Sequence, residues 1–292
     1  MVSVVIPVRD EEATVGPLCR GIEQVLAEPR EIIFVDDGST DRTWEELAKL
    51  HRPGRVRAIR LARNFGKTPA LAAGFAASRG EVIFTMDGDL QDDPQEIPRF
   101  LARLEEGYDL VSGWKKIRHD PAGKVLASRL FNFVVGRLTG LRLHDINCGF
   151  KAYRAAVARS LPLFAEMHRF TPVLAHAMGY RVTELVVTHH PRRHGRSHYG
   201  FARLGKGFLD LFTVLLLTRW SQRPSHGFAL AAVVALVPGA LLLFSPRPPW
   251  PLLGAVLLAG AVVFLAAGLL AEILVNRSSS GAPRCRIREQ LD

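Results

Sequence analysis

The sequence predicts an α/β protein with a mostly parallel sheet, followed by two membrane-spanning helices. Short apolar runs alternate with amphipathic helical patterns through the first half of the chain, which is the order typical of a parallel sheet with helices on both faces. Beyond about residue 222, two apolar stretches, 227–244 and 252–275, contain Glu272 as their only charged residue. At about 1.5 Å per residue, both can cross a hydrocarbon core of about 30 Å, the first only marginally.

The predicted elements of the first half follow one another in a regular βα order. The expected strands are short and rich in Val, Ile and Phe, and they cover 3–8, 31–35, 56–61, 81–86 and 109–112. The expected helices lie between them, at 13–27, 41–50, 67–78 and 94–106. Ligands of such sheets bind at the carboxyl ends of the strands. Acidic clusters follow three of the strands and should meet at one rim, at 10–12, 36–37 and 87–89.

Asp87 and Asp89 are the most informative of these acidic residues. They follow an apolar run and stand on either side of Gly88, so an extended backbone places both carboxylates on the same side. Two carboxylates this close repel each other unless a cation lies between them, and Mg²⁺ prefers one or two carboxylates together with phosphate oxygens. Taken alone, the D-x-D pattern is also typical of turns. The pattern therefore leaves a metal site and a simple turn open.

Charge and cysteine content restrict the classes of function. The net charge is +10, from 38 Lys and Arg against 28 Asp and Glu. No nucleic-acid recognition motif accompanies this charge, so we expect no nucleic-acid partner. An anionic membrane surface and phosphate-bearing substrates explain it better. The three cysteines are scattered, which suits a reducing compartment, and the histidines of 189–198 have no Cys or carboxylate nearby to complete a zinc site.

The arginines around the apolar stretches predict how the chain is oriented in a membrane. Arg219 and Arg223 precede the first stretch, four arginines of 277–288 follow the second, and the connecting segment 245–251 holds only Arg247. The positive-inside rule then places both ends of a multi-pass protein in the cytosol. No secretory signal is recognised at the N-terminus. We expect a catalytic domain on the cytosolic side of the cytoplasmic membrane, although a buried helical hairpin is the alternative for the two stretches.

Six motifs, in order along the chain, point to one family. They are Val5–Glu12, Val35–Asp41, Arg63–Lys67, Met86–Gln91, Asn147–Lys151 and Arg193–Gly200. On these residues the chain resembles the family 2 glycosyltransferases with a GT-A fold, in particular the polyprenyl-phosphate glycosyltransferases related to dolichol-phosphate mannose synthase. The resemblance implies four parts: a GT-A domain, a juxtamembrane amphipathic segment, a transmembrane hairpin and a basic cytosolic tail, at 1–200, 201–225, 226–276 and 277–292.

The resemblance also implies roles for residues of the first four motifs. The nucleotide-sugar would be bound by Pro7, Arg9, Glu12, Asp36, Lys67, Asp87 and Gly88. Mg²⁺ or Mn²⁺ would be held by Asp87, Asp89 and Gln91, and the metal at Asp89 would neutralise charge on the departing nucleoside diphosphate. Helix capping is the alternative role for Asp36, and we expect Thr40 or Asp41 to be the cap instead.

The later motifs would act on the acceptor, which the resemblance implies is polyprenyl phosphate such as undecaprenyl phosphate. The lipid phosphate and the diphosphate would be bound by Arg129, Arg193, Arg196, Ser197 and Tyr199. Arg196 would be catalytic, since an Arg fork matches phosphate oxygens bidentately. His198 stands where the family pattern has Lys. Asp145 matches the acidic candidate base of the family, but a phosphate acceptor demands little proton abstraction, so orienting the acceptor, balancing charge or forming a turn are its alternatives.

Two further segments are candidates for contact with the lipid bilayer. Residues 124–138 mix apolar and basic side chains as in a basic amphipathic helix, and 201–220 has a similar pattern. For the first, a core helix with solvated charges is the alternative. Resembling bacterial enzymes assemble as homo-oligomers, but Gly254 and Gly260 do not have the G-x-x-x-G spacing of packed spans.

Two other functions compete with lipid-linked sugar transfer. Processive polysaccharide synthases share the fold and typically carry Gln-x-x-Arg-Trp; this chain has Arg219-Trp220 but Leu216 in place of the Gln. A catalytically silent, nucleotide-sugar-binding membrane scaffold is the second, and the intact D-x-D argues against it. We therefore expect an inverting hexosyltransferase that moves a sugar from a UDP- or GDP-linked donor to polyprenyl phosphate.

Overall fold

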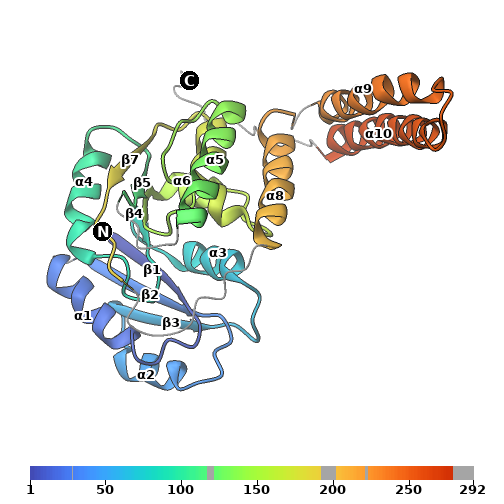
Figure 1. Ribbon diagram of the computed structural model, residues 1–292. Helices are drawn as coiled ribbons and strands as arrows, with labels where there is room; N and C mark the ends of the chain where they lie inside the picture. Colours follow the sequence, from blue (N-terminus) through green and yellow to red (C-terminus); the bar gives the residue numbers. More distant parts are fainter. Residues whose placement is uncertain (28, 117–121, 192–201, 221–222, 279–292) are drawn as a thin grey trace. The chain divides into compact units, whose positions relative to one another are not determined.

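The computed structural model describes residues 1–27, 29–116, 122–191, 202–220 and 223–278, and side chains throughout these ranges except 122–127, 202–208 and 275–278. The chain divides into two compact units, Met1–Asp210 and Leu211–Asp292. Strands and helices alternate along the first unit (Figure 1). Its strands are β1 (Val2–Val8), β2 (Arg30–Asp36), β3 (Val56–Arg60), β4 (Val82–Thr85), β5 (Leu110–Trp114), β6 (Lys151–Arg154) and β7 (Val182–Val186).

The helices of the first unit connect these strands. They are α1 (Val15–Val25), α2 (Thr43–Leu50), α3 (Lys67–Ala77), η1 (Pro94–Glu96), α4 (Ile97–Glu105), α5 (Ala122–Thr139), α6 (Ala155–Ser160), η2 (Met167–Phe170) and α7 (Thr171–Ala177). Helix α8 (Ala202–Thr218) runs across the boundary between the two units. The helices predicted from the first half of the sequence are thus confirmed, with ends that differ by a few residues.

The seven strands form one sheet in the order β3-β2-β1-β4-β6-β5-β7. All neighbours are parallel except β6, which runs antiparallel to both β4 and β5. The prediction of a mostly parallel sheet is therefore confirmed. Strands β6 and β7 were not predicted, because β6 has four residues and begins with a charged Lys151, and the short β7 is only partly buried.

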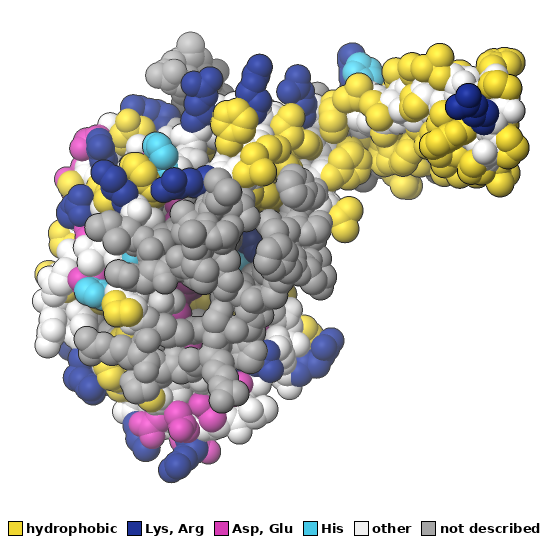
Figure 2. Space-filling model, in the orientation of Figure 1, with side chains coloured by type: hydrophobic (Ala, Val, Ile, Leu, Met, Phe, Trp, Pro, Cys, Tyr) yellow, Lys and Arg dark blue, Asp and Glu magenta, His cyan; other side chains and the backbone are white. Residues whose placement is uncertain are grey.

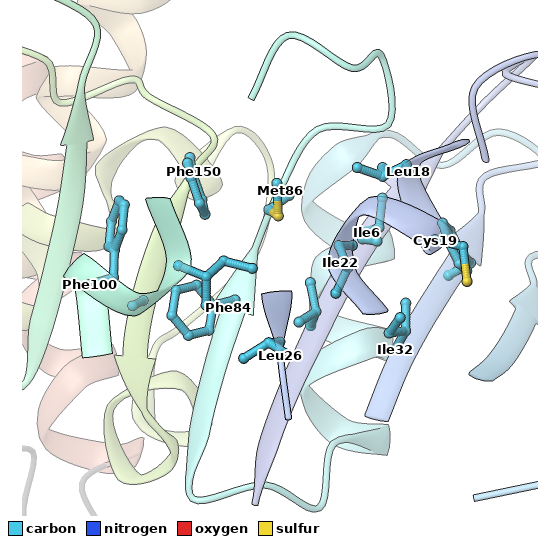
Figure 3. Packing of buried hydrophobic residues seen from close by; sticks show 14 of the residues in the cluster. Ile6, Leu18, Cys19, Ile22, Leu26, Ile32, Phe84, Met86, Phe100 and Phe150 are labelled. Carbon is cyan, nitrogen blue, oxygen red and sulfur yellow. The ribbon is translucent and has the colours of Figure 1, made fainter. Parts of the chain in front are cut away.

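The two faces of the sheet bury alternate residues of the same strands. On one face, Ile6 of β1 and Phe84 of β4 pack against α1 and α4, where Phe100 and Phe150 complete an aromatic cluster (Figure 3). On the other face, α3 lies so close that a Cβ on Gly74 would meet Val5 Cγ1 at 2.2 Å. Helices on both faces hold the carboxyl ends of β1, β2 and β4 at one rim.

The second unit contains α9 (Pro224–Leu243) and α10 (Trp250–Ser278). Both helices are long and apolar enough to cross a membrane, over Pro224–Leu243 and Trp250–Leu274. Their side chains are mostly exposed, and Figure 2 shows a largely hydrophobic surface over this pair. A buried hairpin inside a globular core would not leave these side chains exposed. The two helices are candidate membrane spans.

Glycines let the two candidate spans approach each other closely. A Cβ on Gly254 of α10 would lie 2.7 Å from the carbonyl oxygen of Gly239 in α9, so only glycine fits there. The close contact joins glycines of two different helices. A G-x-x-x-G spacing, which lies within one span, therefore does not describe it.

Candidate active site

The turns after β1 and β2 are joined by hydrogen bonds. The amide of Asp10 donates to Ser39 Oγ at 3.0 Å, and the amide of Thr40 donates to Asp10 Oδ1 at 2.7 Å. Asp10 itself has φ of 54°, a left-handed conformation that an acidic residue tolerates better than most. The hydrogen bond from the Thr40 backbone is the main cause of a lowered pKa of Asp10. The rim therefore carries an ionised and ordered turn at the end of β1.

Asp36 ends β2 and is completely buried. Its Oδ1 accepts hydrogen bonds from the Ser39 amide at 2.8 Å and the Ser39 hydroxyl at 2.5 Å, while Arg60 Nε lies 3.4 Å from Oδ2. One carboxylate oxygen is thus used to close the turn after β2. The other faces a guanidinium, and base or ribose recognition by Asp36 stays a prediction.

Asp37 connects the same turn to the segment before α3. Its carboxylate accepts hydrogen bonds from the amides of Phe65, at 2.7 Å, and Gly66, at 2.9 Å. Gly38 has φ of +69°, and a Cβ there would lie 2.5 Å from the carbonyl carbon of Arg63. The motif Arg63–Lys67 is consequently held against the acidic turn, at the start of the helix that carries Lys67.

Glu12 and Asp41 both stabilise the start of α2. Glu12 Oε2 accepts a hydrogen bond from the Arg42 amide at 3.1 Å, and Asp41 Oδ1 accepts one from the Thr43 amide at 2.9 Å. The N-cap position itself is Arg42, which makes no side-chain cap hydrogen bond, so the expectation of Thr40 or Asp41 as the cap was wrong. Asp41 acts one residue earlier, and the Thr40 amide is directed to Asp10. Carboxylates at this position are also stabilised by the positive N-terminal end of the helix dipole.

The carboxylate of Asp87 lies between a lysine and a glycine. Lys67 Nζ donates a hydrogen bond to Asp87 Oδ1, and Gly149 is so close on the other side that a Cβ would lie 2.6 Å from Oδ2. Burial alone would raise the pKa of Asp87, but the positive charges of Lys67 and Lys115 hold it well below its usual range. Asp87 is thus an anion at physiological pH.

A buried ion pair between Asp92 and Lys115 stabilises the turn after Asp87. Asp92 is buried, its Oδ1 lies 2.9 Å from Lys115 Nζ, and its Oδ2 accepts from the Asp87 amide at 3.3 Å. This pairing raises the pKa of Lys115 although burial acts in the opposite direction. Gly88 also packs tightly, since a Cβ there would meet Val8 Cγ1 at 2.8 Å. These contacts hold the backbone of the D-x-D turn in place.

Asp89 and Gln91 lie at the outer side of this turn. The Gln91 amide donates to Asp89 Oδ1 at 3.2 Å, and Gln91 Nε2 donates to the His190 carbonyl at 3.3 Å. Gln91 Nε2 also lies 3.4 Å from His189 Nε2. Segment 189–190 after β7 is thereby brought to the D-x-D turn, a juxtaposition that sequence reasoning did not anticipate.

The chemistry of these side chains fits a divalent cation that shares its coordination with phosphate. The carboxylate oxygen of Asp89 and the amide oxygen of Gln91 suit Mg²⁺ or Mn²⁺, whereas the imidazole of His189 next to them is a ligand that these hard cations favour less. In the part of the chain that the structure describes, no three His, Cys, Asp or Glu side chains are grouped closely enough to hold a metal ion. A bound metal would therefore need oxygens from a ligand. Since Lys67 already neutralises Asp87, ligation by Asp87 stays a prediction.

A pocket of about 280 Å³ opens beside Asp87. This is slightly smaller than the range of about 300–1,000 Å³ typical of sites for drug-sized ligands. Its walls come from α3, β4, β6, η2 and the loop before β6. The lining residues are Lys67, Leu71, Thr85, Asp87, Asn147, Cys148, Gly149, Lys151, Tyr153, Glu166 and His168.

Lys151 and His168 are two pocket residues whose roles the sequence did not suggest. Burial lowers the pKa of Lys151 to about 8. Burial, followed by the charges of Lys67 and Lys151, lowers the pKa of His168 to about 2, so this imidazole is neutral. Its Nδ1 lies 2.7 Å from Thr68 Oγ1. Lys151 ends the motif Asn147–Lys151, and its place in the otherwise apolar segment 150–153 was the signal that could have predicted its burial in the pocket.

The remaining predicted site residues are only partly located. Asp145 is buried just before the pocket-lining segment 147–149, Pro7 is half-buried in β1, and Arg9 and Arg129 are exposed. The predicted phosphate-binding residues Arg193, Arg196, Ser197 and Tyr199 lie outside the described residues. Their roles in binding stay predictions.

Comparison with known proteins identifies the family. Residues 3–161 match the family described as Glycosyl transferase family 2. The chain belongs to this family. It is therefore a glycosyltransferase.

Two curated relatives are similar to this protein over nearly the whole chain. The dodecaprenyl-phosphate galacturonate synthase of Rhizobium johnstonii is 38% identical, covering 99% of this chain and 93% of that protein. The undecaprenyl-phosphate 4-deoxy-4-formamido-L-arabinose transferase of Pseudomonas paraeruginosa is 37% identical, covering 98% of this chain and 88% of that protein. The resemblance to polyprenyl-phosphate glycosyltransferases is thereby confirmed.

Solved structures confirm the GT-A-like fold. Glucosyl-3-phosphoglycerate synthase from Mycobacterium tuberculosis superposes with a TM-score of 0.57 at 21% identity, covering 75% of this chain and 79% of that one. One structure of that enzyme contains Mn²⁺ and UDP. At this identity the likeness concerns the fold alone.

Proposed function

We propose that the chain transfers one sugar from a nucleotide-sugar to polyprenyl phosphate in a membrane. The observation that carries the proposal is the near-full-length relationship to two transferases named for polyprenyl-phosphate substrates, spans included. The acidic rim at the carboxyl ends of β1, β2 and β4 supports it, because a nucleotide diphosphate bound there would lie beside the pocket next to Asp87.

The reaction is a single displacement at the anomeric carbon. A phosphate oxygen of the lipid attacks C1 of the sugar and forms the new C1–O bond, while the bond from C1 to the diphosphate breaks. The nucleoside diphosphate leaves with the electron pair, so the sugar is transferred with inversion. The acceptor is already an anion and needs little help from a base, which leaves Asp145 the task of orienting it or balancing charge.

The negative charge that develops on the leaving diphosphate must be stabilised. Asp89 and Gln91, with Asp87 and His189 beside them, would hold Mg²⁺ or Mn²⁺, which supplies Lewis-acid stabilisation of the diphosphate when bound. Lys67 adds a positive charge at the same rim. Arg193 and Arg196, with Ser197 and Tyr199, are proposed to contact the phosphates, and Arg129 the lipid headgroup.

The membrane contacts follow from the apolar helices. We propose that α9 and α10 cross the cytoplasmic membrane with the catalytic unit and both chain ends in the cytosol, as the arginines predict. On α5, Leu130 and Phe133 are 60% and 69% exposed beside the exposed Arg129, which suits a helix lying in the interface. Such a helix would hold the active site near the headgroup of its lipid acceptor.

A reconstituted transfer assay tests the proposal against its alternatives. The full chain in lipid would receive undecaprenyl phosphate, Mg²⁺ or Mn²⁺, and a panel of labelled UDP- and GDP-sugars. Label that enters the organic phase as a lipid carrying one sugar is the expected result. A growing water-soluble polymer would indicate a processive synthase, and nucleotide binding without any transfer would indicate a silent scaffold.

A further inference from the structure

The pocket beside Asp87 contains a buried lysine that forms no ion pair with a carboxylate of the described residues. Lys151 is the first residue of β6, in register with Thr85 of β4 and Ser112 of β5, and is only 2% exposed. Its side chain lines the pocket. Among the described residues, no carboxylate oxygen lies within 4.0 Å of the Lys151 ammonium, the distance that defines an ion pair. A buried charge without a partner is costly, so such a group favours an anionic ligand.

The two carboxylates that line this pocket are paired with other cations. Asp87 forms its ion pair with Lys67. Glu166 lies 2.5 Å from Arg169 NH2. Buried Asp145 acts on Lys151 only at a distance longer than an ion pair. Lys151 is therefore the lysine of this pocket whose ammonium no carboxylate of the described residues contacts directly.

His168 adds a neutral hydrogen-bonding group to the same pocket. It comes from η2, and its Nδ1 contacts Thr68 Oγ1 at 2.7 Å, which fixes the ring. The ring is held uncharged beside Lys67 and Lys151. The pocket thus offers nitrogen groups from α3, β6 and η2, and its volume of about 280 Å³ limits it to a small ligand.

We propose that this pocket receives the sugar ring of the donor and that Lys151 pairs with a carboxylate on that ring, so that the donor is a nucleotide-linked hexuronic acid. The inference rests on the proposed function and adds the class of sugar. A neutral hexose would leave the ammonium of Lys151 buried without a counter-charge, whereas a uronate supplies one. The carboxylate takes no part in bond making or breaking at C1.

Matched donor pairs test the inference. Full-length protein in lipid, with undecaprenyl phosphate and Mn²⁺, would be assayed with UDP-galacturonate against UDP-galactose, UDP-glucuronate against UDP-glucose, and GDP-mannuronate against GDP-mannose. Within at least one pair we expect kcat/KM to favour the uronate by about tenfold or more, as for a hydrogen-bonded charge. A preference for the neutral sugar in all pairs would overturn the inference and leave the transferase function intact.

Substitutions at Lys151 separate charge recognition from folding. Lys151→Met should lower kcat/KM for the uronate by about 10- to 100-fold and abolish the preference, whereas Lys151→Arg should keep it. Lys49→Met, on an exposed lysine of α2, is the matched control and should keep the ratio. A preference that survives in Lys151→Met contradicts the assignment.

A binding measurement separates failure of the inference from failure of the proposed function. If no donor supports transfer, the proposed function fails, and the same donor pairs are compared by calorimetric titration. Tighter binding of the uronate to the wild type, lost in Lys151→Met, would still support the pocket assignment. Equal binding within every pair would overturn it.

Discussion

The ammonium of Lys67 forms an ion pair with the carboxylate of Asp87, so the first acid of the D-x-D turn is neutralised by the chain's own helix α3. The two residues come from segments twenty positions apart in the sequence. The turn that Asp37 closes before α3 brings them together. Three acids of the rim thus face cations of this chain: Asp36 faces Arg60, Asp87 faces Lys67 and Asp92 faces Lys115.

Replacing Lys67 tests this balance. Lys67→Met removes the cation from Asp87 and from the rim where we propose that the diphosphate binds. We therefore expect transfer to fall by about 10²-fold, in line with the loss of one positioned charge. The measurement is kcat/KM in the lipid assay. Lys49→Met serves as control, and a Lys67→Met protein with wild-type turnover would show that the pair has no part in transfer.

Gly149 provides a steric test of the same carboxylate. Gly149→Ala places a methyl group about 2.6 Å from Asp87 Oδ2, so the carboxylate or the loop must move. We expect a clear loss of kcat with a folded protein, because small displacements of catalytic groups cost about 10²-fold. Gly16→Ala, whose Cβ would meet only Arg20 at 3.6 Å, is the control and should keep full activity. Equal activity of both variants would contradict the assignment.

Asp89 is expected to be needed for metal-dependent nucleotide binding. Asp89→Asn keeps the shape of the side chain but removes its charge, and we expect the Mn²⁺-dependent gain in UDP affinity to be lost together with transfer. Titration calorimetry with UDP, with and without Mn²⁺, measures the effect apart from turnover. Asp41→Asn, at the start of α2, should keep the Mn²⁺ dependence. If the UDP affinity of Asp89→Asn depended on Mn²⁺ as in the wild type, the assignment of Asp89 as a metal ligand would be contradicted.

The pKa of Lys151 predicts a pH dependence of donor use. Burial lowers this pKa to about 8, although Cys148, Asp145 and Asp87 act to raise it, and Lys67 lowers it further. The ammonium is charged below pH 8 and is lost as the pH rises through that value. We expect kcat/KM for a uronate donor to fall by about tenfold per pH unit above 8.

Two observations check that this fall belongs to Lys151. Lys151→Arg stays charged at these pH values, so the fall above pH 8 should disappear. The stability of the protein should change in the opposite direction, because an unfolded lysine titrates near about 10.4 and the unfolded chain therefore binds more protons between pH 8 and 10. If kcat/KM for the uronate donor still fell above pH 8 in Lys151→Arg, a group other than Lys151 would be responsible.

The aromatic cluster of the sheet face should dominate the stability of the first unit. Phe100 is fully buried, with ring centroids 5.9 Å from Phe84 and 4.6 Å from Phe150. Phe100→Ala should lower the free energy of unfolding by about 3–5 kcal/mol. Phe133→Ala, with a side chain 69% exposed on α5, should change it by less than about 0.5 kcal/mol. Thermal unfolding followed by tryptophan fluorescence compares the two, and equal shifts would contradict the packing.

The parallel half of the sheet could be predicted from the sequence, but its antiparallel part could not. The runs around Val4, Ile32 and Phe84 are buried on both faces and stand out as continuous apolar stretches. Strand β6 has four residues and begins with Lys151, whose charge hides a buried strand position. Its pairing with β4 depends on tertiary contacts between segments about seventy residues apart.

The acidic rim could be predicted as well, but the partners of its acids could not. Alternation of strands and helices places Asp36 and Asp87 at carboxyl ends, whatever the details of packing. The ion pair with Lys67, the neutral His168 and the approach of His189 to Gln91 each depend on how distant loops pack. Residue spacing carries no information about these contacts.

The stoichiometry of transfer tests the central proposal most directly. In a reaction with excess nucleotide-sugar, the nucleoside diphosphate released would be compared with the polyprenyl phosphate consumed. We predict one diphosphate for each lipid converted, no release without the lipid, and no release with Asp89→Asn. Release without polyprenyl phosphate, or several sugars added to each lipid, would contradict a single transfer to a lipid phosphate.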